Sequence, residues 1–135
     1  MLPELEENGY LPPGLHPANL EEIVREFGQA SELRRVQAES LAWLLGLARR
    51  AGVLRVAING SFVSSVEEPN DVDCVLLIGP GFPGDPDAER ELLDGLPFLD
   101  IQLVDQDGWD ELVGRVFGTD RGMVPKGLVE VISWN

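Results

Sequence analysis

Residues 58–75 read INGSFVSSVEEPNDVDCV, and this stretch decides the fold. The run of residues 54–59 is rich in β-branched side chains and ends in Gly60-Ser61, which indicates a strand that runs into a turn. Glycine lets the backbone approach a ligand closely, and the exposed N–H groups of such a turn can meet a phosphate. A second predicted strand, residues 72–78, follows this turn and the loop after it.

Three carboxylates accompany these strands. Asp71 and Asp73 leave the same face of the second strand, about 6.6 Å apart along the chain. Two carboxylates on one face repel each other unless a cation joins them, and carboxylate oxygens suit Mg²⁺ or Mn²⁺. Asp100 interrupts a third, otherwise apolar strand over residues 98–104, which could lie beside the second strand. The sequence therefore predicts a cation site on one face of a sheet.

Each signal also has a purely structural interpretation. Gly60-Ser61 alone is most often a turn, and Asp-x-Asp alone is most often a solvated strand face. Asp100 alone would fit the exposed side of an edge strand. The functional interpretation is favoured because the three signals occur together, in this order and at this spacing.

Helical signals flank the strands. Asn19 is expected to cap a helix over residues 20–27, which Gly28 would end. Ser31 is expected to cap a second helix that runs up to residue 51, which Gly52 would end. The later helices would begin at Asp85-Pro86 and at Asp107. The last strand is expected at residues 128–132, and the proline-rich residues 1–18 as an irregular lead-in. The predicted fold class is α+β: one domain, residues 1–135, with a small mixed sheet packed against helices, two of them N-terminal.

Composition and net charge exclude several classes of function. The chain has 135 residues, 44% of them hydrophobic, and 10 Lys+Arg against 24 Asp+Glu give a formal net charge of −14. So acidic a chain is not expected to bind nucleic acid nonspecifically through phosphates. No apolar run is long enough for a membrane span and no signal peptide is recognisable, so no membrane association is expected. The lone Cys74 fits a reducing compartment, and a cytoplasmic location is predicted.

The sequence resembles the nucleotidyltransferase superfamily that includes the DNA polymerase β palm. Its signature is a strand, Gly-Ser, about ten residues, Asp-x-Asp on the next strand and a third Asp on a neighbouring strand. The matching residues are Gly60, Ser61, Asp71, Asp73 and Asp100. The wider sequence resembles short bacterial nucleotidyltransferase-like proteins at Leu11-Pro12-Pro13-Gly14, Gly60-Ser61-Phe62-Val63, Pro69-Asn70-Asp71-Val72-Asp73, Asp120-Arg121 and Pro125-Lys126-Gly127.

The resemblance implies a minimal polymerase β palm-like fold and a metal-dependent reaction. A nucleoside monophosphate would pass from an NTP to an acceptor hydroxyl on a protein, an RNA or a small molecule, with two Mg²⁺ or Mn²⁺ ions in the site. Asp71 and Asp73 would bind both ions, and Asp100 would complete the site of the ion that activates the acceptor. Gly60 and Ser61 would hold the triphosphate. Positive charge to neutralise the triphosphate or pyrophosphate would come from Arg121 and Lys126.

Two other interpretations stay open. The chain could be a weakly catalytic or non-catalytic partner, such as the antitoxin of a bacterial toxin–antitoxin or defence module, with the other protein encoded nearby. It could also be a regulator that binds nucleotides without turnover. An enzyme requires the three carboxylates to converge on one site, whereas a partner protein should tolerate Asp71→Asn.

Overall fold

The computed structural model describes residues 1–134, which form a five-stranded sheet in the order β1-β5-β2-β3-β4. The parallel pairs are β1 with β5 and β3 with β4, and β2 runs antiparallel to both β3 and β5. The strands are β1 Gly14–Ala18, β2 Arg55–Asn59, β3 Val72–Leu77, β4 Leu99–Val104 and β5 Gly127–Val131. This is the small mixed sheet that the α+β prediction expects.

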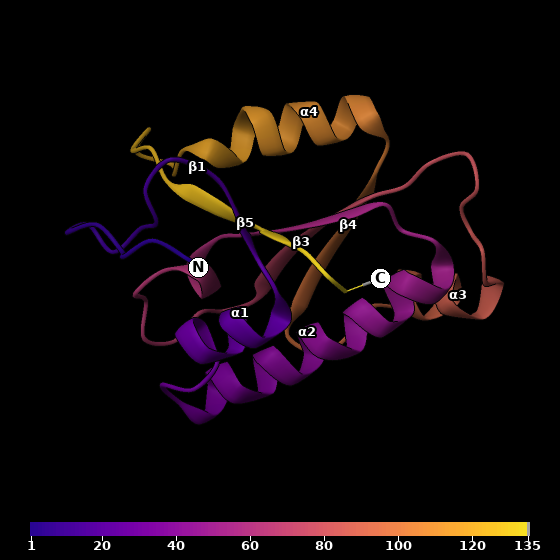
Figure 1. Ribbon diagram of the computed structural model, residues 1–135, viewed down its shortest axis with the longest axis horizontal. Helices are drawn as coiled ribbons and strands as arrows, with labels where there is room; N and C mark the ends of the chain where they lie inside the picture. Colours follow the sequence, from indigo (N-terminus) through magenta and orange to yellow (C-terminus); the bar gives the residue numbers. More distant parts are fainter. Residues whose placement is uncertain (135) are drawn as a thin grey trace.

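Helices cover both faces of the sheet (Figure 1). The chain forms α1 Leu20–Phe27, α2 Glu32–Ala51, α3 Pro86–Asp94 and α4 Gln106–Gly114, with short 3-10 turns at η1 Ser61–Val63 and η2 Val116–Gly118. The two predicted N-terminal caps are confirmed. The Asn19 side chain accepts the N–H of Glu22, and the Ser31 hydroxyl accepts the N–H of Arg34.

Two predicted boundaries were wrong by more than one residue, whereas the ends of the predicted strands differ from the structure by one residue at most. The lead-in, residues 1–18, is not irregular throughout, because it contains β1. Pro17 lacks an N–H, but β1 lies at the edge of the sheet, where a strand tolerates proline. Helix α4 begins earlier than expected because Asp105, not Asp107, caps it by accepting the N–H of Gly108.

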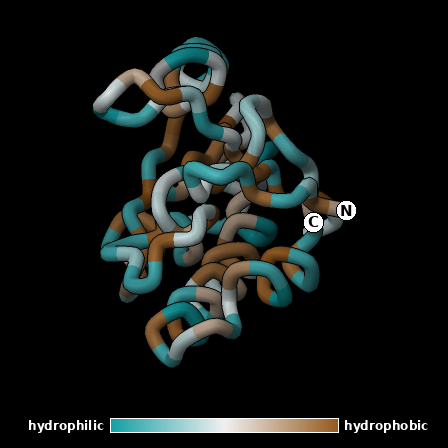
Figure 2. Tube along the Cα trace, turned by 90° about the vertical axis from the view of Figure 1, so that its left-hand side faces the viewer, coloured by the Kyte–Doolittle hydropathy of each residue, from teal (hydrophilic) through white to brown (hydrophobic). Residues whose placement is uncertain are grey.

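Strand alternation divides the apolar residues into two cores. One face of the sheet packs against α1, α2 and α3 through residues such as Ile58, Cys74 and Val129. The other, called here the α4 face, packs Val75 and other strand residues against Trp109 of α4. Figure 2 shows the resulting alternation of hydrophobic and hydrophilic stretches along the chain. Within residues 1–134, no helix combines the length and apolarity that crossing a membrane requires.

Candidate functional site

Strand register brings two of the three predicted aspartates side by side. Asp73 on β3 and Asp100 on β4 are direct partners in the parallel pair. Asp73 lies two residues before Val75, so its side chain belongs to the α4 face. Asp71 precedes the first residue of β3 and is exposed. The structure thus pairs Asp73 with Asp100 and leaves Asp71 at the solvent-exposed start of the strand.

The aspartates do not form a closed metal cage. In the described part of the chain, no group of three or more His, Cys, Asp or Glu side chains is placed to hold a metal ion. The donor chemistry nevertheless fits a hard divalent cation, because Asp73 and Asp100 present carboxylate oxygens from neighbouring strands. Asp71 is the further carboxylate that could join such a pair.

The environment of Asp73 disfavours its negative charge. Burial raises the pKa of the Asp73 carboxyl above its ordinary value, and the charges of Asp100 and Asp71 raise it further. The positive charge of Lys126 acts in the opposite direction on the same pKa. An additional cation beside Asp73 would therefore relieve an electrostatic cost that the fold already carries.

This cost predicts a pH-dependent effect of Asp73→Asn. The pKa of Asp73 is higher in the folded than in the unfolded chain. Protonation of Asp73 therefore stabilises the folded protein fully at low pH, and this stabilisation is lost as the pH rises through the pKa of the folded state. In urea unfolding from about pH 3 to pH 7, the variant should gain stability relative to the wild type as pH rises. The exposed Asp94→Asn provides the control and should not diverge in this way. A pH-independent difference for Asp73→Asn would contradict the prediction.

Gly60 lies directly against the Asp73 carboxylate. Its φ of +85° and ψ of −160° place it in a backbone region that is nearly reserved for glycine. A Cβ atom at this position would collide with Oδ2 of Asp73. Ser61 follows as the first residue of η1, and its carbonyl accepts the Ser64 hydroxyl at 2.6 Å. The glycine is therefore needed both for the turn and for the close approach of the carboxylate.

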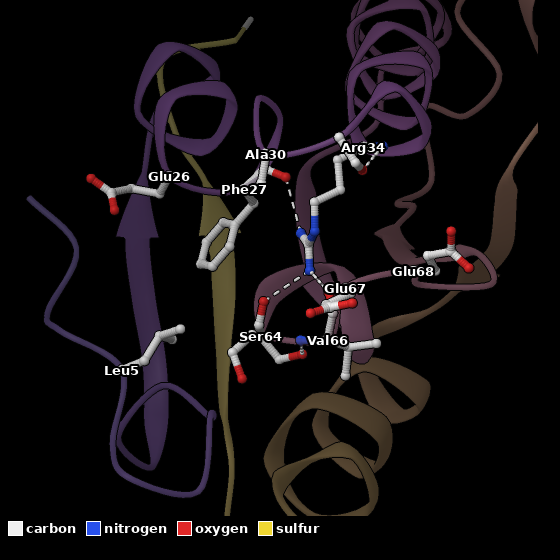
Figure 3. A pocket seen from close by; sticks show the side chains of 11 residues that line it. Leu5, Glu26, Phe27, Ala30, Arg34, Ser64, Val66, Glu67 and Glu68 are labelled. Carbon is white, nitrogen blue, oxygen red and sulfur yellow. Dashed lines mark hydrogen bonds between the residues drawn. The ribbon is translucent and has the colours of Figure 1, made fainter.

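Arg34 holds the loop that follows Gly60, and sequence reasoning missed it. Although its side chain is charged, Arg34 is only 4% exposed. Its guanidinium donates to five backbone carbonyls, and Figure 3 shows it pointing from α2 into the loop after Gly60. The acceptors are the carbonyl oxygens of Phe27, Ser61, Phe62, Ser64 and Val66. Burial lowers the pKa of Arg34.

Two buried amides complete the surroundings of this loop. Gln37 Nε2 donates to the carbonyl of Pro69 at 2.7 Å, so α2 anchors the far end of the loop as well. Gln37 Oε1 and Asn59 Oδ1 are buried and have no hydrogen-bond partner in the described residues. Asn59 is the strand partner of Asp73. Buried amide oxygens normally accept a hydrogen bond, and the described residues provide no donor for Asn59 Oδ1.

The structure separates the two predicted cations. Lys126 is half-buried directly before β5, and its charge acts on Asp73. Arg121 lies exposed in the preceding turn and forms no ion pair with any described residue. Asp120 fixes that turn by accepting the N–H groups of Gly122 and Val124 and the hydroxyl of Tyr10. Lys126 is thus the cation that the fold places near the carboxylates.

The comparison with known proteins covers nearly the whole chain. A family model described as "Family of unknown function (DUF6932)" matches residues 3–132, a range that includes all five strands. No curated protein and no solved structure matches the chain significantly. The matched range also contains every predicted site residue, namely Gly60, Ser61, Asp71, Asp73, Asp100, Arg121 and Lys126. The chain therefore belongs to the family of unknown function DUF6932.

Proposed function

We propose that the chain is a metal-dependent nucleotidyltransferase with a minimal polymerase β palm-like fold. The observation that carries the proposal is the contact of Gly60 with Asp73 while Asp73 lies beside Asp100. These residues come from the end of β2, from β3 and from the start of β4, which are neighbouring strands. Their order and placement correspond to the Gly-Ser, Asp-x-Asp and third-Asp signature of the superfamily that the sequence resembles.

Each residue has a role in the proposed reaction. Asp73 and Asp100, together with Asp71, would hold Mg²⁺ or Mn²⁺, which when bound supplies charge neutralisation at the transferred phosphate. Gly60 and Ser61 would bind the triphosphate, and Lys126 would neutralise the departing pyrophosphate, with Arg121 available from the exposed turn.

In the reaction itself, an acceptor oxygen forms a new bond to the α-phosphorus. The bond from that phosphorus to the pyrophosphate oxygen breaks. The acceptor loses its proton to the carboxylate of Asp100, which lies beside the paired Asp73. The acceptor hydroxyl would belong to a protein, an RNA or a small molecule.

Transfer of label from an α-phosphate-labelled NTP tests the proposal. The purified protein is incubated with each NTP, with Mg²⁺ or Mn²⁺, and with a lysate of its host as the source of acceptors. The Asp71→Asn/Asp73→Asn variant should lose at least about 100-fold of the transfer rate, because it removes charge stabilisation at the reacting phosphate.

The matched control is Asp87→Asn/Asp94→Asn, which removes two exposed carboxylates from α3. Helix α3 packs in the core on the opposite face of the sheet. This control should transfer label at the wild-type rate. Absence of transfer with every NTP, from a folded wild-type protein, would overturn the proposal.

An acidic cavity favours a second candidate, a binding partner within a bacterial two-gene module. The cavity of about 470 Å³ lies beside the turn between α1 and α2, and its lining includes Glu26, Glu67 and Glu68, the buried Arg34, and apolar Leu5 and Val66 (Figure 3). Charge complementarity would guide a basic segment of another protein to this surface. This candidate predicts that Asp71→Asn leaves function intact and that a neighbouring gene encodes the target.

A further inference from the structure

We infer that a cavity beside Lys126 holds the nucleoside part of the nucleotide, an assignment that rests on the proposed function. The cavity has a volume of about 640 Å³ and lies between the start of β1, helix α4 and the segment that enters β5. Its lining includes Leu15, Arg55, Trp109, Asp110, Val113 and Lys126. A volume of this size is typical of small-molecule sites, which hold roughly 300–1,000 Å³.

The order of the strands places this cavity correctly for a nucleotide. The cavity lies at β1 and β5, whereas the paired aspartates lie on β3 and β4. Gly60 ends β2, the strand between these two regions, and Trp109 of the cavity packs in the same core as Val75 of β3. A triphosphate bound at Gly60 would therefore have the carboxylates on one side and the cavity on the other.

Lys126 connects the cavity with the carboxylates. It lines the cavity directly before β5, and the start of β5 runs antiparallel beside the end of β2, where Gly60 and the strand partner of Asp73 lie. It forms no ion pair with a described residue, so its ammonium can donate hydrogen bonds to a phosphate. Arg55, the other cation of the lining, is already engaged. It donates to both carboxylate oxygens of Glu130 at 2.7 and 2.6 Å, and its guanidinium lies 4.7 Å from the Trp109 ring centroid.

The cavity has opposite charges at its polar groups, which restricts the ligand. Asp110 accepts the Gln106 amide at 2.9 Å through Oδ1 and has no other hydrogen-bond partner in the described chain. Its carboxylate repels phosphate and attracts hydrogen-bond donors, such as ribose hydroxyls or a base amino group. The apolar wall of Leu15 and Val113 suits an uncharged ring. A nucleotide matches the positive charge, the hydrogen-bond acceptor and the apolar wall together, with its phosphates at Lys126 and its nucleoside in the cavity. A bare polyphosphate matches only the positive charge.

Filling the cavity tests this assignment. Gly118 lines it, its carbonyl accepts the Lys126 N–H at 2.9 Å, and a Cβ atom there would meet open space. Gly118→Leu adds a side chain at the wall of the cavity, at a position where its Cβ meets no neighbouring atom. Gly81→Leu is the matched control, because Gly81 has equally open surroundings and does not line the cavity.

Calorimetric titrations with ATP, GTP, CTP, UTP and inorganic tripolyphosphate, each with Mg²⁺, provide the readout. At least one NTP should bind the wild type and Gly81→Leu about tenfold or more tightly than tripolyphosphate does. Gly118→Leu should abolish this difference while leaving the affinity for tripolyphosphate unchanged. Asp110→Ala, which opens no buried space, should weaken the same NTP about tenfold and serves if Gly118→Leu fails to fold.

The outcomes separate the two proposals. Equal affinities for all NTPs and tripolyphosphate would overturn the nucleoside cavity and leave nucleotide transfer standing. A preference for an NTP over tripolyphosphate that is unchanged in both Gly118→Leu and Asp110→Ala would also overturn the nucleoside cavity and leave nucleotide transfer standing. If neither NTPs nor tripolyphosphate bind the folded wild type, the proposed function itself is wrong, and the cavity assignment is overturned with it.

Discussion

Replacing Arg34 with methionine should lower the free energy of unfolding by about 3 kcal/mol or more, because several buried carbonyls would lose their donor. The guanidinium of Arg34 donates hydrogen bonds to five backbone carbonyls within residues 27–66. Methionine keeps the length and apolar stem of the side chain but donates no hydrogen bond. Urea unfolding monitored by far-UV circular dichroism measures the loss.

Arg35→Met is the matched control, since Arg35 is the exposed neighbour of Arg34 on the same helix. It should change the free energy of unfolding by no more than about 0.5 kcal/mol. Arg34→Lys should lie between the two variants, because an ammonium has three donors and cannot reproduce the planar fork of the guanidinium. Equal stabilities of Arg34→Met and Arg35→Met would show that the buried hydrogen bonds do not hold the loop.

Gly60→Ala should cost about 2–4 kcal/mol of stability, the combined effect of backbone strain and overpacking. The φ of +85° is unfavourable for alanine, and its Cβ would collide with the Asp73 carboxylate. Label transfer should fall together with stability, because the collision displaces Asp73 from its place beside Asp100. Gly81→Ala, with nothing near its Cβ position, should leave both quantities unchanged.

A double-mutant cycle separates the two causes. In an Asp73→Ala background the collision is absent, so Gly60→Ala should cost only the strain of its backbone, about 1–3 kcal/mol. The coupling energy between the two positions then measures the contact of Gly60 with Asp73. Additive effects would mean that the carboxylate does not press against the glycine.

Local signals predicted most of the fold. Asn19, Ser31 and Asp85 cap helices where their side chains were expected to do so, because an N-cap depends on residues only two or three positions away. The side-chain period of two along a strand also explains why Cys74, one residue after Asp73, lies in the core on the opposite face of the sheet. β1 was missed because its strand character comes from pairing with β5, which residues near Pro17 do not reveal.

The candidate site was only partly predictable for a similar reason. The Asp-x-Asp spacing and the third aspartate were visible locally, and the pairing of β3 with β4 then put Asp73 next to Asp100. Nothing local distinguishes Arg34 from Arg35, since burial of the first depends on a loop that folds back onto α2. Likewise, the proximity of Lys126 to Asp73 and the exposure of Arg121 follow from where β5 enters the sheet.

The place of β5 also has a consequence for biosynthesis. β5 follows all the other strands along the chain, yet it lies between β1 and β2 in the sheet. While residues 127–131 are still inside the ribosome, β1 has no neighbour and β2 lacks one of its two partners. Such pairing between distant segments slows folding and leaves unpaired strand edges exposed in the meantime. Lys126, directly before β5, would join the proposed nucleotide site in this last step. If the proposed function holds, the nascent chain should remain unable to bind nucleotide until this strand has left the ribosome.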